Sequence, residues 1–174
     1  VPRFPVQTLA EAGDSVECID VGTESGLIAV GSVDGHVRVY DIRAGQLSTD
    51  ALGGPVVELA LGRDAQYYAA AVLPGTVRLV DLQGDGALSR LAEYSGADFA
   101  DTHTGLAFAD NEASILSGSV DGRVVRWEVL GEEPKVVYNA TSAITCLKRH
   151  EATGSTLIGC IDGSLVKLPE SESP

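Results

Sequence analysis

The sequence predicts an all-β chain that is built from four similar antiparallel units. An eleven-residue stretch occurs twice, as GSVDGHVRVYD from Gly31 and as GSVDGRVVRWE from Gly118. Weaker copies of its turn end at Gly75 and Gly163, so that the four turn glycines, starting at Gly35, stand 40, 47 and 41 residues apart. A composition of 20 Gly, one Trp and three Phe in 174 residues is typical of short strands joined by tight turns. The period is that of a four-stranded β-propeller blade.

Each unit is predicted to contain a first strand, a turn, a second strand, a tight hairpin, a third strand and an outer strand that leads to the next unit. The first strands are SVECIDV, PVVELAL, TGLAFA and AITCLKR, and the second strands are LIAVGSV, YYAAAVL, SILSGSV and TLIGCI. The outer strands are GQLSTDAL, LSRLAEY and PKVVYNA. No segment has the apolar period of a helix over a useful length.

The repeated stretch is interpreted as a structural hairpin. Asp-Gly between two strands favours a two-residue turn, because glycine accepts a positive φ and aspartate tolerates left-handed geometry. In the second unit Pro74-Gly75 replaces Asp-Gly, which predicts a different turn there.

The chain is predicted to be one partial propeller with four blades. The first blade covers residues 5–47 and begins with a leading outer strand, PVQTL. The other blades cover residues 47–84, 85–130 and 131–168, and residues 169–174 form an acidic tail.

The third strands read VYDI, LVDL, RWEV and VKLP, which resembles the Trp-Asp dipeptide of WD-repeat propellers in a worn form. Only Trp127-Glu128 keeps the tryptophan, and the Gly-His dipeptide of the family is missing before the blades. Ser32 and Ser119 occupy the place expected for the family's serine, although no His–Ser–Trp–Asp chain of hydrogen bonds is expected.

Three stretches, PVQTLAEAGDSV, AVGSVDGHVRVYDIRAGQL and YSGADFADTHTGL, are similar in this order to the C-terminal half of the mitogen-activated protein kinase organiser family, also called the WD repeat domain-containing protein 83 family. This resemblance implies a seven-bladed, non-catalytic scaffold. It also implies roles in the assembly of kinase cascades and in spliceosomal complexes, and a link to a prolyl hydroxylase of hypoxia sensing. These roles correspond to a protein of the cytoplasm and the nucleus.

Four units make about half of such a ring, and the blade faces at its two ends would expose apolar surface. Three further blades are expected from an N-terminal segment that precedes this chain or from another polypeptide. In the alternative arrangement the four units close alone, with PVQTL pairing beside SLVKL.

A net charge of −13 argues against direct binding to nucleic acid. Two explanations of this charge stay open: it confers solubility alone, or it favours basic protein partners. The chain shows no signal peptide and no apolar run of about 18 residues, so no membrane contact is expected. Cys18, Cys146 and Cys160 lie in apolar runs without metal-ligand spacing and are expected to be buried, reduced thiols. No metal or cofactor is predicted.

Candidate partner-binding residues lie in the hairpin turns and in the loops that lead into the first strands, which share one face of a propeller. They are Asp14, Ser15, Asp34, His36, Gly54, Pro55, Asp121, Arg123, Asp162 and Ser164. For the aspartates, turn chemistry alone is the competing explanation.

Two other functions stay open beside the scaffold. One is a structural subunit that completes a large ribonucleoprotein or other assembly without selecting partners. The other, more remote, is a propeller hydrolase, which needs two carboxylates or a nucleophile and a base that converge. His36, His103 and His150 lie in different units and no catalytic motif is present, so the prediction is that the chain is not an enzyme.

Overall fold

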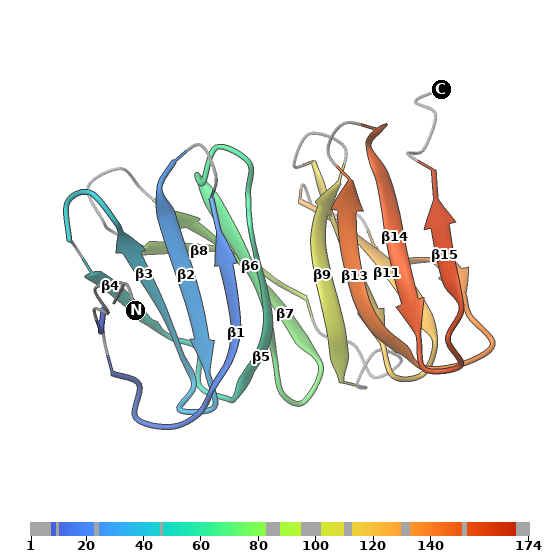
Figure 1. The fold of residues 1–174 in the computed structure, drawn as a ribbon, viewed down its shortest axis with the longest axis horizontal. Helices are drawn as coiled ribbons and strands as arrows, with labels where there is room; N and C mark the ends of the chain where they lie inside the picture. The colour runs from blue at the N-terminus through green and yellow to red at the C-terminus, as the bar shows by residue number, and fades with distance from the viewer. Residues whose placement is uncertain are drawn as a thin grey trace, which may run out of the picture.

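Fifteen β-strands form four separate antiparallel sheets in the described part of the computed structural model (Figure 1). The structure describes residues 8–9, 11–22, 25–45, 47–82, 88–94, 102–109, 113–129, 133–150 and 153–169. No α-helix occurs among these residues, and hence none that is long and apolar enough to span a bilayer. The predicted all-β class is confirmed.

In every sheet the strands hydrogen-bond in chain order, from an inner strand outward. The first sheet contains β1 (Val16–Val21), β2 (Leu27–Ser32), β3 (His36–Asp41) and β4 (Leu47–Ala51). The second contains β5 (Val56–Leu61), β6 (Tyr67–Val72), β7 (Thr76–Leu82) and β8 (Leu88–Tyr94). The third contains β9 (His103–Ala109), β10 (Ser114–Ser119), β11 (Arg123–Glu128) and β12 (Lys135–Asn139). Within the described residues the fourth has three strands, β13 (Ile144–His150), β14 (Ser155–Cys160) and β15 (Leu165–Leu168).

The inner strands lie side by side: β1 contacts β5, β5 contacts β9, and β9 contacts β13. Figure 1 shows the sheets following one another across the molecule, from the blue first sheet to the orange and red fourth sheet. The chain therefore forms an arc of blades around its inner strands.

The predicted units begin one strand before these sheets. The outer strands β4, β8 and β12 are each the fourth strand of a sheet and hydrogen-bond to its third strand. The predicted boundaries at 47, 85 and 131 instead assign each of them to the following unit. The predicted unit boundaries count repeats along the chain and stay a prediction. Most of PVQTL and most of the acidic tail lie outside the described residues.

The four turn glycines occupy equivalent places, each between the second and third strands of its sheet. Gly35, Gly75, Gly122 and Gly163 have φ values of 82°, 95°, 87° and 85°. This left-handed region suits glycine, which has no Cβ to clash there. The hairpin of the second sheet also forms, and a cis peptide bond joins Leu73 and Pro74 in it. The Gly75 amide donates to the carbonyl oxygen of Val72 at 3.1 Å, as the Gly35 amide does to that of Ser32.

Each inner strand has the same irregularity near its beginning. Pairing with the second strand skips one residue: Glu17 in β1, Val57 in β5, Thr104 in β9 and Thr145 in β13. The hydroxyl of Thr104 donates to the carbonyl oxygen of Ile144 in the fourth sheet, at 2.7 Å. A bulge that recurs at one place in four sheets shows that the sheets are structural repeats.

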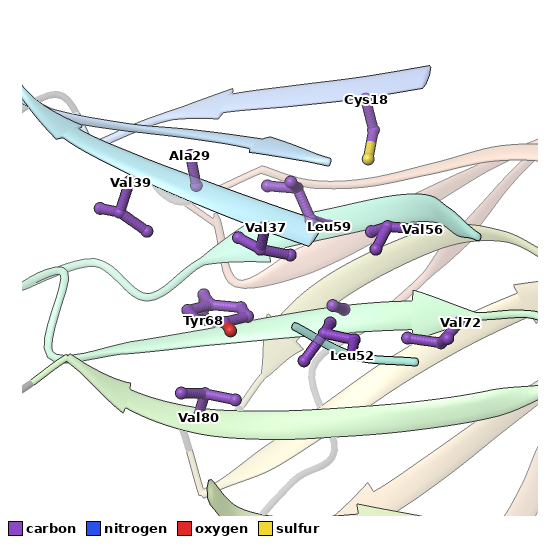
Figure 2. Packing of buried hydrophobic residues seen from close by; sticks show 11 residues of the cluster. Cys18, Ala29, Val37, Val39, Leu52, Val56, Leu59, Tyr68, Val72 and Val80 are labelled. Carbon is purple, nitrogen blue, oxygen red and sulfur yellow. The ribbon is translucent and has the colours of Figure 1, made fainter. Parts of the chain in front are cut away.

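Apolar clusters fill the spaces between successive sheets. Figure 2 shows the cluster between the first two sheets, where Val37 and Val39 of the first face Leu59 and Tyr68 of the second. Leu59, Leu106 and Leu147 are at most 1% exposed, and each lies at the same position of an inner strand and faces the sheet before its own. Blade stacking thus supplies the core, because a single sheet cannot bury both of its faces.

Polar contacts also join neighbouring sheets. The Tyr68 hydroxyl donates to Oδ2 of Asp50 at 2.6 Å, and the Leu61 amide donates to Oδ2 of Asp20 at 2.8 Å. The Arg78 guanidinium reaches from the second sheet to the carbonyl oxygen of Leu52.

Apolar side chains are exposed at both ends of the arc, although Ile28 and Tyr40, on the same outward face of the first sheet as Ile19, are 8% and 7% exposed. At the first end, Ile19 is 61% exposed, although it is equivalent to the buried Leu59. At the other end, Leu165 is 74% exposed, although its counterparts Val37, Val77 and Val124 are fully buried.

The prediction of three buried cysteines is wrong for Cys146. Cys18 and Cys160 are buried, but Cys146 is exposed. Cys18 and Cys146 occupy equivalent positions, opposite Gly31 and Gly159. Cys18 belongs to the cluster between the first and second sheets, whereas Cys146 lies on the uncovered face of the fourth sheet. The difference in exposure therefore comes from the presence of a neighbouring sheet and not from the strand itself.

Candidate interaction face

The aspartates of the three Asp-Gly turns hold those turns together. Oδ1 of each aspartate accepts a hydrogen bond from the backbone amide two residues later. Asp34 accepts from His36 at 3.1 Å, and Asp162 accepts from Ser164 at 2.9 Å. Asp121 accepts from the amide of Arg123, also at 2.9 Å. Turn chemistry therefore accounts for the position of all three carboxylates.

Asp34 has a further structural role, because it ties the loop before β1 to the first hairpin. Its Oδ2 accepts from the amide of Gly13 and from Nη2 of Arg38, each at 2.7 Å. The hydrogen bond from Arg38 is the main reason that the pKa of Asp34 lies well below its usual range. This carboxylate is thus occupied within its own sheet.

The other two carboxylates are also kept ionised. Burial raises the pKa of Asp121, but its hydrogen bonds and ion pair with Arg123 outweigh burial and lower it overall. The hydroxyl of Ser164 donates to Asp162 at 2.7 Å and is the main cause of the lowered pKa of Asp162. Asp162 lies at the surface, where its charge is available to a partner.

Each hairpin turn is hydrogen-bonded to the loop that leads into the same sheet. Val33 donates to the carbonyl oxygen of Ser15 at 3.0 Å, and Leu73 donates to that of Pro55 at 2.9 Å. The corresponding donors of the third and fourth sheets are Val120, to Thr102 at 3.2 Å, and Ile161, to Ala143 at 2.9 Å. The predicted face of turns and loops is therefore present in all four sheets; we call it the turn face.

The candidate residues are brought together sheet by sheet on the turn face. The hydroxyl of Ser32 joins the entry loop to the first turn: it donates to the carbonyl oxygen of Asp14 at 3.2 Å and accepts from the Asp34 amide. Asp14 and Ser15 therefore lie beside Asp34 and His36. A Cβ on Gly54 would lie 2.6 Å from the carbonyl oxygen of Leu73, so this glycine is required by close packing. The binding of a partner by these residues stays a prediction.

Two apolar residues on the turn face were missed by the sequence reasoning. Val120 is 45% exposed and Ile161 is 73% exposed, and each directly precedes the aspartate of its turn. The signal was present in SVDG and CIDG, where a β-branched apolar residue stands in a turn.

The expected loss of the family's hydrogen-bond chain is only partly right. Nε1 of Trp127 donates to the hydroxyl of Ser117 at 2.7 Å, and the His103 ring lies edge-on to Trp127 with centroids 5.9 Å apart. The serine that holds the tryptophan is thus Ser117 and not Ser119. The Ser119 hydroxyl accepts from the Asp121 amide at 3.4 Å, as the Ser32 hydroxyl does from the Asp34 amide at 3.2 Å, so both hydroxyls stabilise the turns that follow their strands.

The histidines do not form a common site. Nδ1 of His36 lies 3.0 Å from the carbonyl oxygen of Asp34 on the turn face. His103 is buried between sheets, and Nδ1 of His150 lies 2.9 Å from the Thr153 hydroxyl at another hairpin. Across the described ranges, no group of three or more His, Cys, Asp or Glu side chains could hold a metal ion.

Comparisons with known proteins agree with this architecture. Residues 3–41 match the family described as WD domain, G-beta repeat. The computationally designed Ika4 protein is 20% identical with a TM-score of 0.75, over 94% of this chain and 96% of that chain. The beta-propeller domain of Cps50 (Swd1) from Myceliophteria thermophila is 16% identical with a TM-score of 0.71, over 90% of this chain and 53% of that chain. The sheets, the turns and the repeat match define a WD-repeat β-propeller.

Within this class, the chain is similar to WD repeat domain-containing protein 83 over most of its length, and the resemblance read from the sequence is confirmed. It is 32% identical to the Homo sapiens protein over 92% of this chain and 50% of the relative. It is 36% identical to the Rattus norvegicus protein over 72% of this chain and 38% of the relative. An uncharacterized WD repeat-containing protein of Schizosaccharomyces pombe is 32% identical over 92% of this chain and 53% of the relative. The chain spans about half the length of the curated relatives it matches.

Proposed function

We propose that this chain is part of a non-catalytic WD-repeat scaffold that organises multiprotein complexes. The observation that carries the proposal is the turn face, where four hydrogen-bonded turn-and-loop pairs present side chains on a rigid row of sheets. Loops held on a rigid framework are where binding residues concentrate in proteins. Partners are proteins, including basic ones, because the chain carries a net charge of −13.

The finer assignment rests on similarity to the WD repeat domain-containing protein 83 family. We propose a role in assembling a kinase cascade, a spliceosomal complex or both, in the cytoplasm and the nucleus. A structural subunit that completes a large assembly is the second candidate function. It is favoured by the self-contained hydrogen bonding of Asp34, which leaves that carboxylate little capacity for a partner.

We also propose that further blades, from a segment preceding Val1, complete a seven-bladed ring. Two observations support this part of the proposal: the chain spans about half of its relatives, and both ends of the arc expose apolar side chains that are buried elsewhere. Full closure of a ring is the way in which propellers remove such faces. A closed ring of four blades is the competing arrangement.

Co-purification from extract tests the scaffold. Val120→Lys changes an exposed valine of the turn face, and Val136→Lys changes an equally exposed valine on the outer strand β12 as a matched control. Because both residues are exposed, both variants should keep the circular dichroism spectrum and the melting temperature of the parent protein.

The scaffold is supported if Val120→Lys loses a subset of partners that the control retains. Identical partner sets for the parent and both variants would contradict recognition by this part of the turn face and favour the structural subunit. Three further units of the same period before Val1 in the encoded protein would support the seven-bladed ring, and a continuation without them would contradict it.

A further inference from the structure

The uncovered face of the fourth sheet has a defined composition, because directly paired residues of adjacent antiparallel strands point to the same side. The register of β13, β14 and β15 places Cys146, Gly159 and Leu165 in one row. The next row on the same side consists of Lys148, Leu157 and Lys167. We call these six residues the lysine face; Figure 1 shows their sheet, in orange and red, at one end of the molecule.

The corresponding face is a stacking surface in each of the other three sheets. Its rows are Cys18, Gly31, Val37 and Asp20, Ala29, Val39 in the first sheet. They are Glu58, Ala71, Val77 and Ala60, Ala69, Leu79 in the second. They are Gly105, Gly118, Val124 and Ala107, Leu116, Arg126 in the third. Most of these side chains are buried against the sheet that follows, whereas Cys146, Lys148, Leu165 and Lys167 are exposed. The lysine face is thus one half of an interface between blades.

The charge of this face is unusual for the chain. The sequence contains three lysines, and two of them, Lys148 and Lys167, flank Leu157 in one row. Their counterparts are Asp20 and Val39 in the first sheet, Ala60 and Leu79 in the second, and Ala107 and Arg126 in the third. Arg126 is ion-paired with Glu128 of its own strand, whereas the two rows of the lysine face contain no carboxylate. An ammonium group that is covered without a carboxylate loses its hydration and gains no partner. A sheet that stacks here must therefore offer acidic side chains.

The chain's own carboxylates satisfy this requirement only in part. The charge of Lys148 lowers the pKa of Glu58, although burial, the larger cause, leaves that pKa raised overall. No salt bridge joins Glu58 to Lys148, both of which lie in described parts of the chain. For Lys167, no salt bridge is present within the described parts of the chain.

The opposite end of the arc does not complement the lysine face. The outward rows of the first sheet are Ile19, Val30, Arg38 and Val21, Ile28, Tyr40. They contain one cation and no carboxylate, and Arg38 is already paired with Asp34. Closing four blades on themselves, or adding a second copy of the chain head to tail, would bring these rows onto two lysines.

We propose that the lysine face stacks on a different antiparallel sheet, formed by the segment preceding Val1, which places Asp or Glu side chains opposite Lys148 and Lys167. This inference rests on the proposed completion of the ring and adds the chemistry of the sheet that touches the fourth blade. The length of the relatives, of which this chain spans about half, provides the chain for that sheet.

Zero-length carbodiimide cross-linking of the protein purified from its own cells, followed by mass spectrometry, tests the contact. We expect Lys148 and Lys167 to be joined to carboxylates of a strand outside Val1–Pro174 in the same polypeptide. Both lysines should also be acetylated at least about tenfold more slowly than the surface residue Lys135. Cross-links to carboxylates of the first sheet, or to another polypeptide, would overturn the inference, and so would free acetylation of both lysines.

Variants of the same protein separate this inference from completion of the ring. Lys148→Glu with Lys167→Glu should lower the melting temperature, whereas Lys148→Arg with Lys167→Arg should keep it and Lys135→Glu serves as the control. Leu165→Asp should lower it if any sheet covers this face. A loss with Leu165→Asp and none with the double glutamate variant would overturn the acidic sheet but keep the ring; no loss with either would overturn both.

Discussion

The interior of the arc and its two ends are built from the same rows of residues but differ in burial. Leu106 on β9 is 1% exposed because the second sheet covers it, whereas Ile19, at the same position of β1, is 61% exposed. Val124 and Leu165 show the same contrast at the other end, at 0% and 74%. The difference shows that the burial of a residue in this fold depends on whether a neighbouring sheet covers it. A row of apolar residues therefore indicates which face of a sheet can pack against a neighbour, but not that a neighbour is present.

The largest expected effect comes from truncating an inner-strand leucine. Leu106→Ala removes a side chain buried between two sheets and should cost about 2–5 kcal/mol of unfolding free energy. Ile19→Ala should cost less than about 1 kcal/mol, because the side chain is already exposed. Urea unfolding of both variants measures the difference. Equal losses would mean that the first end is covered in solution.

Thiol reactivity should separate the equivalent cysteines Cys18 and Cys146. Burial, with the nearby negative charge of Glu58, raises the pKa of Cys18 to about 12. Because the thiolate is the nucleophile, the burial and raised pKa of Cys18 should make it react at pH 8 at least about a hundredfold more slowly than an exposed thiol. Timed alkylation with mass spectrometry should therefore find Cys146 modified first, with the buried Cys160 as a slow control. Equal rates at Cys18 and Cys146 would contradict the burial of Cys18.

A methyl group added at Gly105 should be tolerated less well than one at Gly159, although the two glycines lie in matching rows. A Cβ at Gly105 would lie 2.6 Å from the backbone nitrogen of Leu147, which cannot move without shifting β13. At Gly159 the nearest atom is the Cys146 sulfur at 2.7 Å, on an exposed side chain that can rotate. Gly105→Ala should cost about 1–3 kcal/mol and Gly159→Ala clearly less. Thermal unfolding checks both, and the opposite order would show that β13 yields more easily than one side chain.

The smallest effect is expected at Glu58. Burial raises its pKa, so the folded protein holds the proton more tightly than the unfolded chain does. The ionised carboxylate therefore opposes folding at neutral pH, and this penalty disappears as the pH falls through the folded-state pKa. Glu58→Gln should raise the free energy of unfolding at pH 7 by at most about 0.5 kcal/mol, and this gain should vanish at acidic pH. A loss of stability at pH 7 would mean that attraction to Lys148 outweighs burial.

The strands and hairpins were predictable because their signals are local. Alternating apolar residues and the Asp-Gly turns at Gly35 and Gly122 depend on neighbours in sequence, so the repeat showed them directly. The exposure of Cys146 was missed because the run around it was read as apolar. Lys148, two residues further along β13 and on the same face, was the signal in the sequence that this face differs from its counterparts. The bond between Trp127 and Ser117 was missed because family spacing pointed to Ser119, while the register of β10 turns Ser117 toward the indole.

At the candidate face, the sequence identified the turns but not the state of their carboxylates. Asp34 and Asp162 occupy equivalent turns, yet Asp34 is held by Arg38 and Gly13, whereas Asp162 is held mainly by Ser164. Arg38 is four residues from Asp34, so this partner could have been found in the sequence. The contact with Gly13 spans 21 residues, and short-range patterns do not encode it.

The single tryptophan gives the molecule a natural optical reporter in its middle. Trp127 is 1% exposed in the cluster between the second and third sheets, with its indole nitrogen bonded to Ser117. Its emission should respond only when these two sheets separate, so loosening of the outermost blades would pass unseen in a fluorescence melt. Backbone spectroscopy that starts to change at lower temperature than the tryptophan signal would reveal that the arc melts inward from its ends.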